Sequence, residues 1–157
     1  MKLRELLKGI DYEIVQGQID VEINNVDYDS RKVEKEDVFV CIKGFQADGH
    51  KYAKSAIEKG INAVICEDDI ETDNKRVTII KTNDTRKALA VIGANLYDKP
   101  SKKMKMIGVT GTNGKTTTAL MIKTILEEEG KKVGLIGTIA NYIGKESLET
   151  ERTTPES

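Results

Sequence analysis

A glycine-rich turn between an apolar segment and an amphipathic segment is the feature that most constrains the fold of this chain. The apolar segment Met104–Thr110 is typical of a buried strand, and Thr116–Glu129 places apolar residues at helical spacing. The turn between them contains Gly108, Gly111 and Gly114. Glycines allow a sharp turn in which consecutive N–H groups converge, and the helix start adds partial positive charge. The sequence therefore predicts a strand, a phosphate-binding turn and a helix in succession.

The residues of this turn predict how a nucleotide would be held. The Lys115 amine can reach the β- and γ-phosphates, and the Thr116 hydroxyl can bind the magnesium ion that bridges them. Together they would hold ATP for phosphoryl transfer, with Lys115 as the catalytic cation. The alternative is a glycine-rich turn with a solvated lysine, and the flanking strand and helix argue against it. The expected ATP-binding residues are Gly111, Thr112, Asn113, Gly114, Lys115, Thr116 and Thr117.

The segment after this helix predicts a second strand. Gly130 is the expected helix stop, and the apolar run Val133–Thr138 is typical of a strand. The result is one β-α-β unit, which is too small to cover both faces of a parallel sheet. We therefore expect a truncated domain, since the chain reaches Ser157 without a closing element. The apolar stripe of the helix is expected to be core: Leu120, Ile122, Ile125 and Leu126.

The first part of the chain alternates β-branched runs with helical patterns, which predicts a small α/β domain. The polar, glycine-containing segment Lys43–His50 should be a loop after a strand, where ligand contacts are common. Pro100 and the charges around it should end the preceding helix, so we place a domain boundary there, between residues 1–99 and 100–157. Strands are expected at Val21–Asp27, Val38–Ile42, Ala63–Cys66 and Val77–Lys81, and helices at Tyr52–Lys59 and Thr85–Tyr97.

Composition limits the partners of this protein. The 25 Lys and Arg residues nearly balance the 26 Asp and Glu residues, so no overall charge favours nucleic acid or an anionic membrane. No apolar stretch approaches the roughly 20 residues of a membrane helix, and the charged start does not resemble an export signal. Cys41 and Cys66 lie in apolar runs, which indicates buried thiols in a reducing compartment. We expect a cytoplasmic protein.

The phosphate-binding turn departs from the commonest P-loop spacing, because Val109 stands where the first glycine would be. Its form, Gly-x-x-Gly-Thr-Asn-Gly-Lys-Thr-Thr at 108–117, resembles the Mur ligases and the folylpolyglutamate synthetases. Upstream, residues 29–33, 37–40 and 44–50 resemble the amino-terminal domain of Mur ligases, which the folate enzymes lack. Gly134–Thr138 and the later Thr-Thr-Pro resemble the Mur ligases that add the third amino acid. These ordered motifs cover nearly the whole chain.

This resemblance implies an ATP-dependent ligase of three domains that acts in peptidoglycan precursor synthesis. ATP, with Mg²⁺, would phosphorylate the terminal carboxylate of UDP-N-acetylmuramoyl-dipeptide and leave as ADP. The amine of an amino acid would then attack the acyl phosphate to form an amide and release phosphate. Residues 1–99 would bind the UDP end of the substrate, and residues 100–157 would begin the central ATPase domain. A second magnesium site with a modified lysine would lie beyond Ser157. We expect a monomer, and we expect this chain by itself to lack ligase activity.

The resemblance also implies which residues contact the UDP substrate. They are Tyr28, Ser30, Phe45, Gln46, Ala47, Thr153 and Thr154. Asp29 and Ser30 could instead only cap a local turn. Other family members have His at the position of Phe45, and Thr153 and Thr154 could belong to a frayed end.

Other interpretations stay open at this stage. His50 invites a catalytic role, but a histidine beside Gly49 at a helix start is more often a capping or packing residue. A nucleotide-binding or UDP-sugar-binding module without turnover would keep the phosphate-binding turn. A MurF-type ligase is a further alternative within the family. A P-loop kinase or switch GTPase is disfavoured, since the chain has no Asn-Lys-x-Asp motif.

Overall fold

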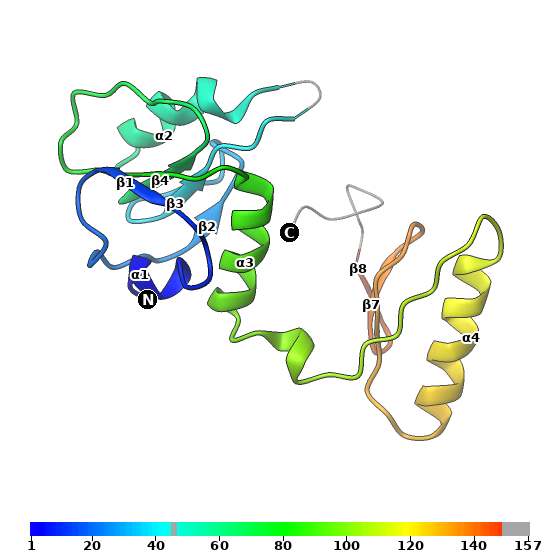
Figure 1. Ribbon diagram of the computed structural model, residues 1–157. Coiled ribbons are helices and arrows are strands. Elements are labelled where there is room, and N and C mark those ends of the chain that lie inside the picture. The colour runs from blue at the N-terminus through cyan, green and yellow to red at the C-terminus, as the bar shows by residue number, and fades with distance from the viewer. Residues whose placement is uncertain (45–46, 149–157) are drawn as a thin grey trace. The chain divides into compact units, whose positions relative to one another are not determined.

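The computed structural model describes residues 1–44 and 47–148 of the chain. The chain divides into two compact units, the first comprising Met1–Lys103 and the second starting at Met104 (Figure 1). Each unit is described by itself below.

The first unit is built on a five-stranded sheet with the order β1-β5-β4-β3-β2. Strands β2 to β5 run parallel, and β1 pairs antiparallel with β5. The carboxyl ends of the four parallel strands therefore lie at one edge of the sheet. The strands are β1 (Glu13–Gln16), β2 (Val26–Asp27), β3 (Val38–Val40), β4 (Ala63–Cys66) and β5 (Thr78–Lys81).

Helices cover both faces of this sheet. Helices α1 and α3 contribute side chains to one buried cluster, and α2 contributes to the other. Asp84 caps α3, because its side chain accepts a hydrogen bond from the Lys87 amide at 2.9 Å. The helices are α1 (Leu3–Leu6), α2 (Ala53–Glu58) and α3 (Thr85–Leu96), with short 3-10 turns η1 (Gly49–Tyr52) and η2 (Pro100–Lys102).

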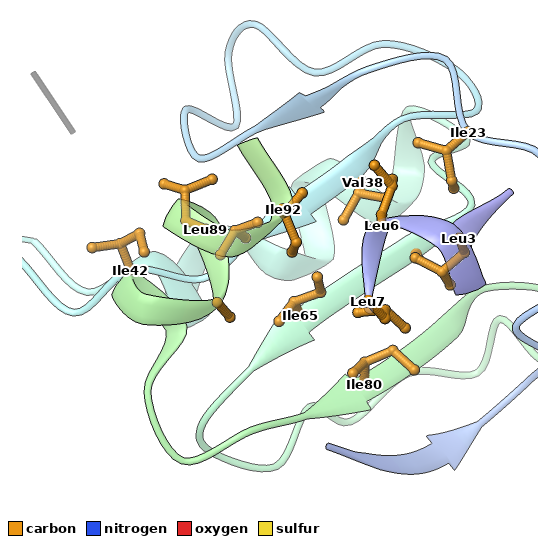
Figure 2. Packing of buried hydrophobic residues seen from close by; sticks show 13 residues of the cluster. Leu3, Leu6, Leu7, Ile23, Val38, Ile42, Ile65, Ile80, Leu89 and Ile92 are labelled. Carbon is orange, nitrogen blue, oxygen red and sulfur yellow. The ribbon is translucent and has the colours of Figure 1, made fainter. Parts of the chain in front are cut away.

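Successive residues of β3 and β4 belong alternately to the two buried clusters, one on each face of the sheet. Figure 2 shows leucines of α1 and Leu89 and Ile92 of α3 around Ile65 and Ile80 of the sheet. Every residue of β3 and β4 is buried, as expected for parallel strands covered on both faces. Cys41 and Cys66 are free and buried in the second cluster, so the prediction of buried thiols is confirmed. Burial raises the pKa of the Cys66 thiol to about 11 and also raises the pKa of Cys41.

The α/β prediction for this unit is confirmed, with differences at its weakest elements. The strand expected at Val21–Asp27 is limited to Val26–Asp27, with a single bridge between Lys2 and Glu22 before it. The sequence patterns gave no signal for α1 or β1. Helix α1 is a single turn that is stabilised by the burial of Leu3 and Leu6. Strand β1 is largely exposed and is stabilised by its antiparallel pairing with β5.

The second unit contains one long helix and a small antiparallel sheet in the order β6-β7-β8 (Figure 1). The predicted helix is confirmed as α4 (Lys115–Glu128). Its predicted stop is confirmed too, because Gly130 has φ 74°, a left-handed conformation that suits glycine. The strands are β6 (Gly134–Leu135), β7 (Asn141–Ile143) and β8 (Glu146–Leu148).

Three detailed predictions for the second unit are wrong. Residues 104–110 form no strand, and Met106 is 68% exposed. The strand expected at Val133–Thr138 is reduced to β6, which pairs antiparallel with β7. The helical stripe is not core, because no residue of α4 is buried and Ile125 is 63% exposed. A strand exists only when a neighbour accepts its hydrogen bonds, and none of the described residues pairs with 104–110.

Candidate functional site

The phosphate-binding turn adopts a backbone conformation that depends on glycine. Gly111 has φ 149° and Gly114, the residue that precedes α4, has φ 75°. Both values lie where side chains are disfavoured. The amides of Lys115, Thr116 and Thr117 form the first turn of α4, so they have no acceptor inside the helix. The turn thus presents N–H groups at the positive end of the helix dipole.

The Lys115 side chain folds back over this turn. Its Nζ donates a hydrogen bond to the Gly111 carbonyl at 2.7 Å. A Cβ on Gly114 would meet no heavy atom within 4 Å, so the space beside the turn is open. The donors fit a polyphosphate with magnesium: an ammonium and N–H groups complement phosphate oxygens, and the half-buried Thr116 offers a hydroxyl oxygen to a hard cation. The structure therefore brings the predicted ATP-binding residues together in one continuous turn.

The residues predicted to contact the UDP substrate fall at the carboxyl edge of the first sheet. Tyr28 and Ser30 follow β2, and Ala47 lies in the loop after β3. Since β2 and β3 are adjacent parallel strands, the two segments leave the sheet side by side. Ligands of open α/β sheets bind at this edge. Phe45, Gln46, Thr153 and Thr154 lie outside the described residues.

Residues 29–33 form a tight turn, called the Ser30 turn below. The Asp29 carboxylate accepts hydrogen bonds from the Arg31 amide at 3.0 Å and from its guanidinium at 2.9 and 2.7 Å. These bonds lower the pKa of the Asp29 carboxyl to about 2. The amides of Lys32 and Val33 donate to the Asp29 carbonyl at 2.9 and 3.3 Å. Ser30 is therefore presented by a turn whose conformation is set on both sides.

The loop after β3 has a fixed base. Lys43 and Asp48 form an isolated antiparallel bridge, and the Gly44 amide donates to the Ala47 carbonyl at 2.8 Å. Gly49 packs against backbone: an added Cβ would lie 2.7 Å from the Ile42 nitrogen. The close approach explains why a glycine stands there.

His50 anchors this loop to the segment that follows β4. Its Nδ1 lies 2.6 Å from Asp48 Oδ1, and its Nε2 accepts from the amides of Glu67 at 3.0 Å and Asp68 at 3.2 Å. A neutral ring that donates through Nδ1–H and accepts through Nε2 satisfies all three contacts. The side chain is 8% exposed. The structure assigns His50 the packing and anchoring role that the sequence favoured over catalysis.

Asp48, His50 and Asp68 offer ligand atoms within 4.8 Å of one another, a spacing that could suit a cation. However, the atoms that could bind a cation already accept hydrogen bonds from protein groups. The His50 Nε2 faces two N–H groups, and the Lys43 ammonium lies 2.9 Å from the Asp68 carboxylate. This cluster is therefore a closed hydrogen-bond network that supports the loop.

Two residues that support these segments, Glu67 and Lys59, are not among the site residues predicted from the sequence. Glu67 accepts hydrogen bonds from the Thr85 amide at 2.9 Å and hydroxyl at 2.8 Å, which ties the end of β4 to the start of α3. Lys59 contacts the Ser30 turn from the end of α2. A lysine directly before a helix-ending glycine was the one available signal for Lys59. No sequence pattern could have shown that Glu67 meets Thr85.

Within the described ranges, no helix combines the length and the apolar character needed to cross a membrane.

Two family models match consecutive parts of the chain. The model described as "Mur ligase family, catalytic domain" matches residues 22–97, and the model described as "Mur ligase middle domain" matches residues 109–157. The first match contains the Ser30 turn and the loop after β3. The second contains most of the phosphate-binding turn and α4.

Individual proteins give the same result. The UDP-N-acetylmuramoyl-L-alanyl-D-glutamate--2,6-diaminopimelate ligase of Clostridium tetani is 53% identical over 159 residues, covering 100% of this chain and 33% of that protein. The crystal structure of MurF from Acinetobacter baumannii is 29% identical with a TM-score of 0.65, covering 88% of this chain and 28% of that one.

A solved UDP-N-acetylmuramoyl-L-alanyl-D-glutamate--2,6-diaminopimelate ligase shares the fold, with a TM-score of 0.71 at 24% identity over 94% of this chain and 29% of that one. The chain spans about a third of the length of the curated relatives that it matches. With both family models in order along the sequence and a relative matched from end to end of the chain, this protein belongs to the Mur ligase family.

Proposed function

We propose that this chain is the amino-terminal part of a MurE-type ligase, which adds the third amino acid to UDP-N-acetylmuramoyl-dipeptide in peptidoglycan precursor synthesis. The observation that carries the proposal is the 53% identity to a 2,6-diaminopimelate ligase along the whole chain. Because that relative is named for 2,6-diaminopimelate, we propose the same amino acid here. The protein would act as a monomer in the cytoplasm.

The two parts of the chain would divide the substrates between them. Residues 1–99 would bind the UDP end of the muramyl substrate, and residues 100–157 would begin the ATP-binding domain. Support for the first role comes from the carboxyl edge of the sheet, where the turn after β2 and the loop after β3 emerge together. The proposed contacts are Tyr28, Ser30, Phe45, Gln46 and Ala47, with Thr153 and Thr154 at the end of the chain.

The phosphate-binding turn would hold ATP. Amides of residues 111–117 would bind phosphate oxygens, and the Lys115 ammonium would leave the Gly111 carbonyl to neutralise charge on the γ-phosphate. Thr116 would ligate Mg²⁺ through its hydroxyl oxygen. When bound, the magnesium ion would reduce the repulsion between the substrate carboxylate and the γ-phosphate. Lys115 would thereby favour transfer of the phosphoryl group to that carboxylate, which activates it for attack by an amine.

A MurF-type ligase is the second candidate, favoured by the structural likeness to MurF at 29% identity. The two candidates differ in the muramyl peptide that they extend. A single set of ligase assays therefore separates them.

The deciding experiment uses the full-length protein that contains this chain, with ATP, Mg²⁺ and UDP-N-acetylmuramoyl-L-Ala-D-Glu. Mass spectrometry should show a tripeptide product with 2,6-diaminopimelate and stoichiometric ADP. Extension of the tripeptide substrate alone would establish the MurF-type candidate instead. Nucleotide binding without any product would indicate a binding module.

The isolated chain provides a second test. We expect no ADP formation from it when dipeptide substrate and amino acid are both present, because the proposed second magnesium site lies outside it. ADP formation that required both substrates would contradict this assignment.

A further inference from the structure

The Lys59 ammonium is a hydrogen-bond hub on the Ser30 turn. It donates to the carbonyl oxygens of Ser30 at 2.8 Å, Arg31 at 2.9 Å and Val33 at 3.4 Å. An ammonium has three N–H donors. These three bonds use all of them on a single turn of backbone, 26 to 29 residues away in sequence.

The end of α2 determines where this ammonium begins. The helix ends at Glu58, and Lys59 is its C-cap residue. Gly60 has φ 84°, and its amide donates to the Ile57 carbonyl at 3.0 Å, which fixes the backbone on both sides of Lys59. The Lys59 stem therefore starts from a well-defined helix end and not from a free loop.

The same turn is also attached to α2 by apolar packing. Val33 is 2% exposed and belongs to the buried cluster that contains Ile57 and Ala56 of α2. The turn thus has an apolar anchor at Val33 and a polar anchor at Lys59, both on one helix. Asp29 and Arg31 close its other side through their own hydrogen bonds.

Lys59 binds these carbonyls of the Ser30 turn with a charged donor. Hydrogen bonds from a charged donor are stronger than those between neutral groups. Because the Ser30 carbonyl is one acceptor, the ammonium holds the backbone of the residue proposed to contact the uridine end of the substrate. Substrate affinity should therefore depend on Lys59 although its donors are turned toward the protein.

We propose that Lys59 is a positioning residue for the uridine-diphosphate end of the substrate, acting through the Ser30 turn. The inference rests on the proposed function and adds a specific residue to it. Lys59 fixes the turn before the ligand arrives, so the ligand does not bear the cost of ordering it. The effect should appear in the KM for the UDP substrate and leave the KM for ATP unchanged.

The test compares Lys59→Met with the wild type in the full-length protein. Methionine retains an apolar stem of similar length and removes all three donors. We expect the KM for UDP-N-acetylmuramoyl-L-Ala-D-Glu to rise about tenfold, which corresponds to the loss of charged hydrogen bonds. The kcat and the KM for ATP should stay within about twofold, since the change is confined to substrate binding. Lys59→Arg, which keeps the charge and several donors, should recover most of the affinity.

Two controls separate positioning from general destabilisation. Lys54→Met changes another exposed lysine of α2 and should leave both KM values unchanged. Urea unfolding of each variant shows whether the fold is retained. A lower kcat together with raised KM values for both substrates, in proportion to the lost stability, would overturn the positioning role.

Ser30→Ala and calorimetry with UDP distinguish this inference from the proposed function. A raised KM in Ser30→Ala with an unchanged KM in Lys59→Met would overturn the role of Lys59 alone. If the wild-type protein bound neither UDP nor the UDP substrate, the proposed function would fail and the inference would fail with it.

Discussion

Every residue of β3 and β4 in the first unit is buried, whereas no residue of α4 in the second unit is buried. Helices α3 and α4 both carry apolar side chains at helical spacing, and α4 is the longer of the two, with 14 residues against 12. Helix α3 buries apolar side chains against the first sheet, whereas α4 touches the small second sheet, with Lys123 over the Tyr142 ring, and is at most half-buried along its length. The comparison shows that an amphipathic pattern predicts a helix reliably, while burial of its apolar face requires a partner element.

The two proposed substrate sites differ in the same way. The Ser30 turn and the loop after β3 depend on contacts from distant residues, including Lys59 and His50. The phosphate-binding turn depends on its own glycines and on the start of α4. We therefore expect substitutions in the first unit to act through stability and positioning, and substitutions in the turn to act on chemistry alone.

The largest expected effect is that of Lys115→Ala. In the full-length protein this change should lower the rate of ligation by about 10²- to 10³-fold, because a preorganised cation for the γ-phosphate is lost. The unfolding midpoint of the 157-residue chain should not move, since Lys115 is exposed and its ammonium donates to the Gly111 carbonyl of the same exposed turn. A rate within tenfold of the wild type would contradict the role of Lys115 in phosphoryl transfer.

Core substitutions test the difference in packing directly. Ile92→Ala in α3 should destabilise the chain by about 2–5 kcal/mol, because this side chain is fully buried. Ile125→Ala in α4 is the matched control and should cost no more than about 0.5 kcal/mol. Urea unfolding followed by far-UV circular dichroism measures both. Equal losses would mean that the second unit has a core of its own.

Two glycines provide a similar comparison with a smaller effect. Gly49→Ala should destabilise the chain by about 1–3 kcal/mol, because the new Cβ would collide with the backbone of Ile42. Gly108→Ala should change the stability by less than about 0.5 kcal/mol, since its added Cβ would meet open space. Thermal unfolding of the two variants should show the difference. A stable Gly49→Ala variant would indicate that the loop base can shift freely.

The smallest expected effect concerns Asp29 and pH. Its pKa is lowered from 3.8 to about 2, chiefly by hydrogen bonds from Arg31. The stabilisation is therefore fully present above the unfolded value and is lost as the pH falls through about 2. An NMR titration of the Asp29 carboxyl should show the low pKa and its return toward 3.8 in Arg31→Gln. An unchanged pKa in that variant would exclude the Arg31 side chain as the cause.

Elements that depend on local sequence patterns were predicted correctly, whereas elements that depend on contacts between distant residues were not. The run Ala63–Cys66 was placed correctly because a continuous apolar segment needs burial on both faces, whatever its neighbours are. The start of α4 was placed because Gly114 and the residues after it specify a helix start locally. Strand β1 could not be predicted, since its largely exposed residues become a strand only by pairing with β5.

The candidate sites show the same limit. The sequence identified the Ser30 turn and the phosphate-binding turn through their motifs, but the assignment of their ligands stays a prediction. It gave no means of pairing Lys59 with Ser30, because the two residues are 29 positions apart and only the packing of α2 brings them together.

The sequence by itself determined the α/β class, the helix and glycine-dependent turn of the second unit, and membership of the Mur ligase family, because motifs and apolar periodicity are local properties of the chain. The tertiary structure decided the sheet order, the addition of β1, the hydrogen bonds that fix the Ser30 turn and the exposure of the second unit. These features depend on which distant groups meet, since a hydrogen bond or a buried face requires two partners and a local pattern specifies only one.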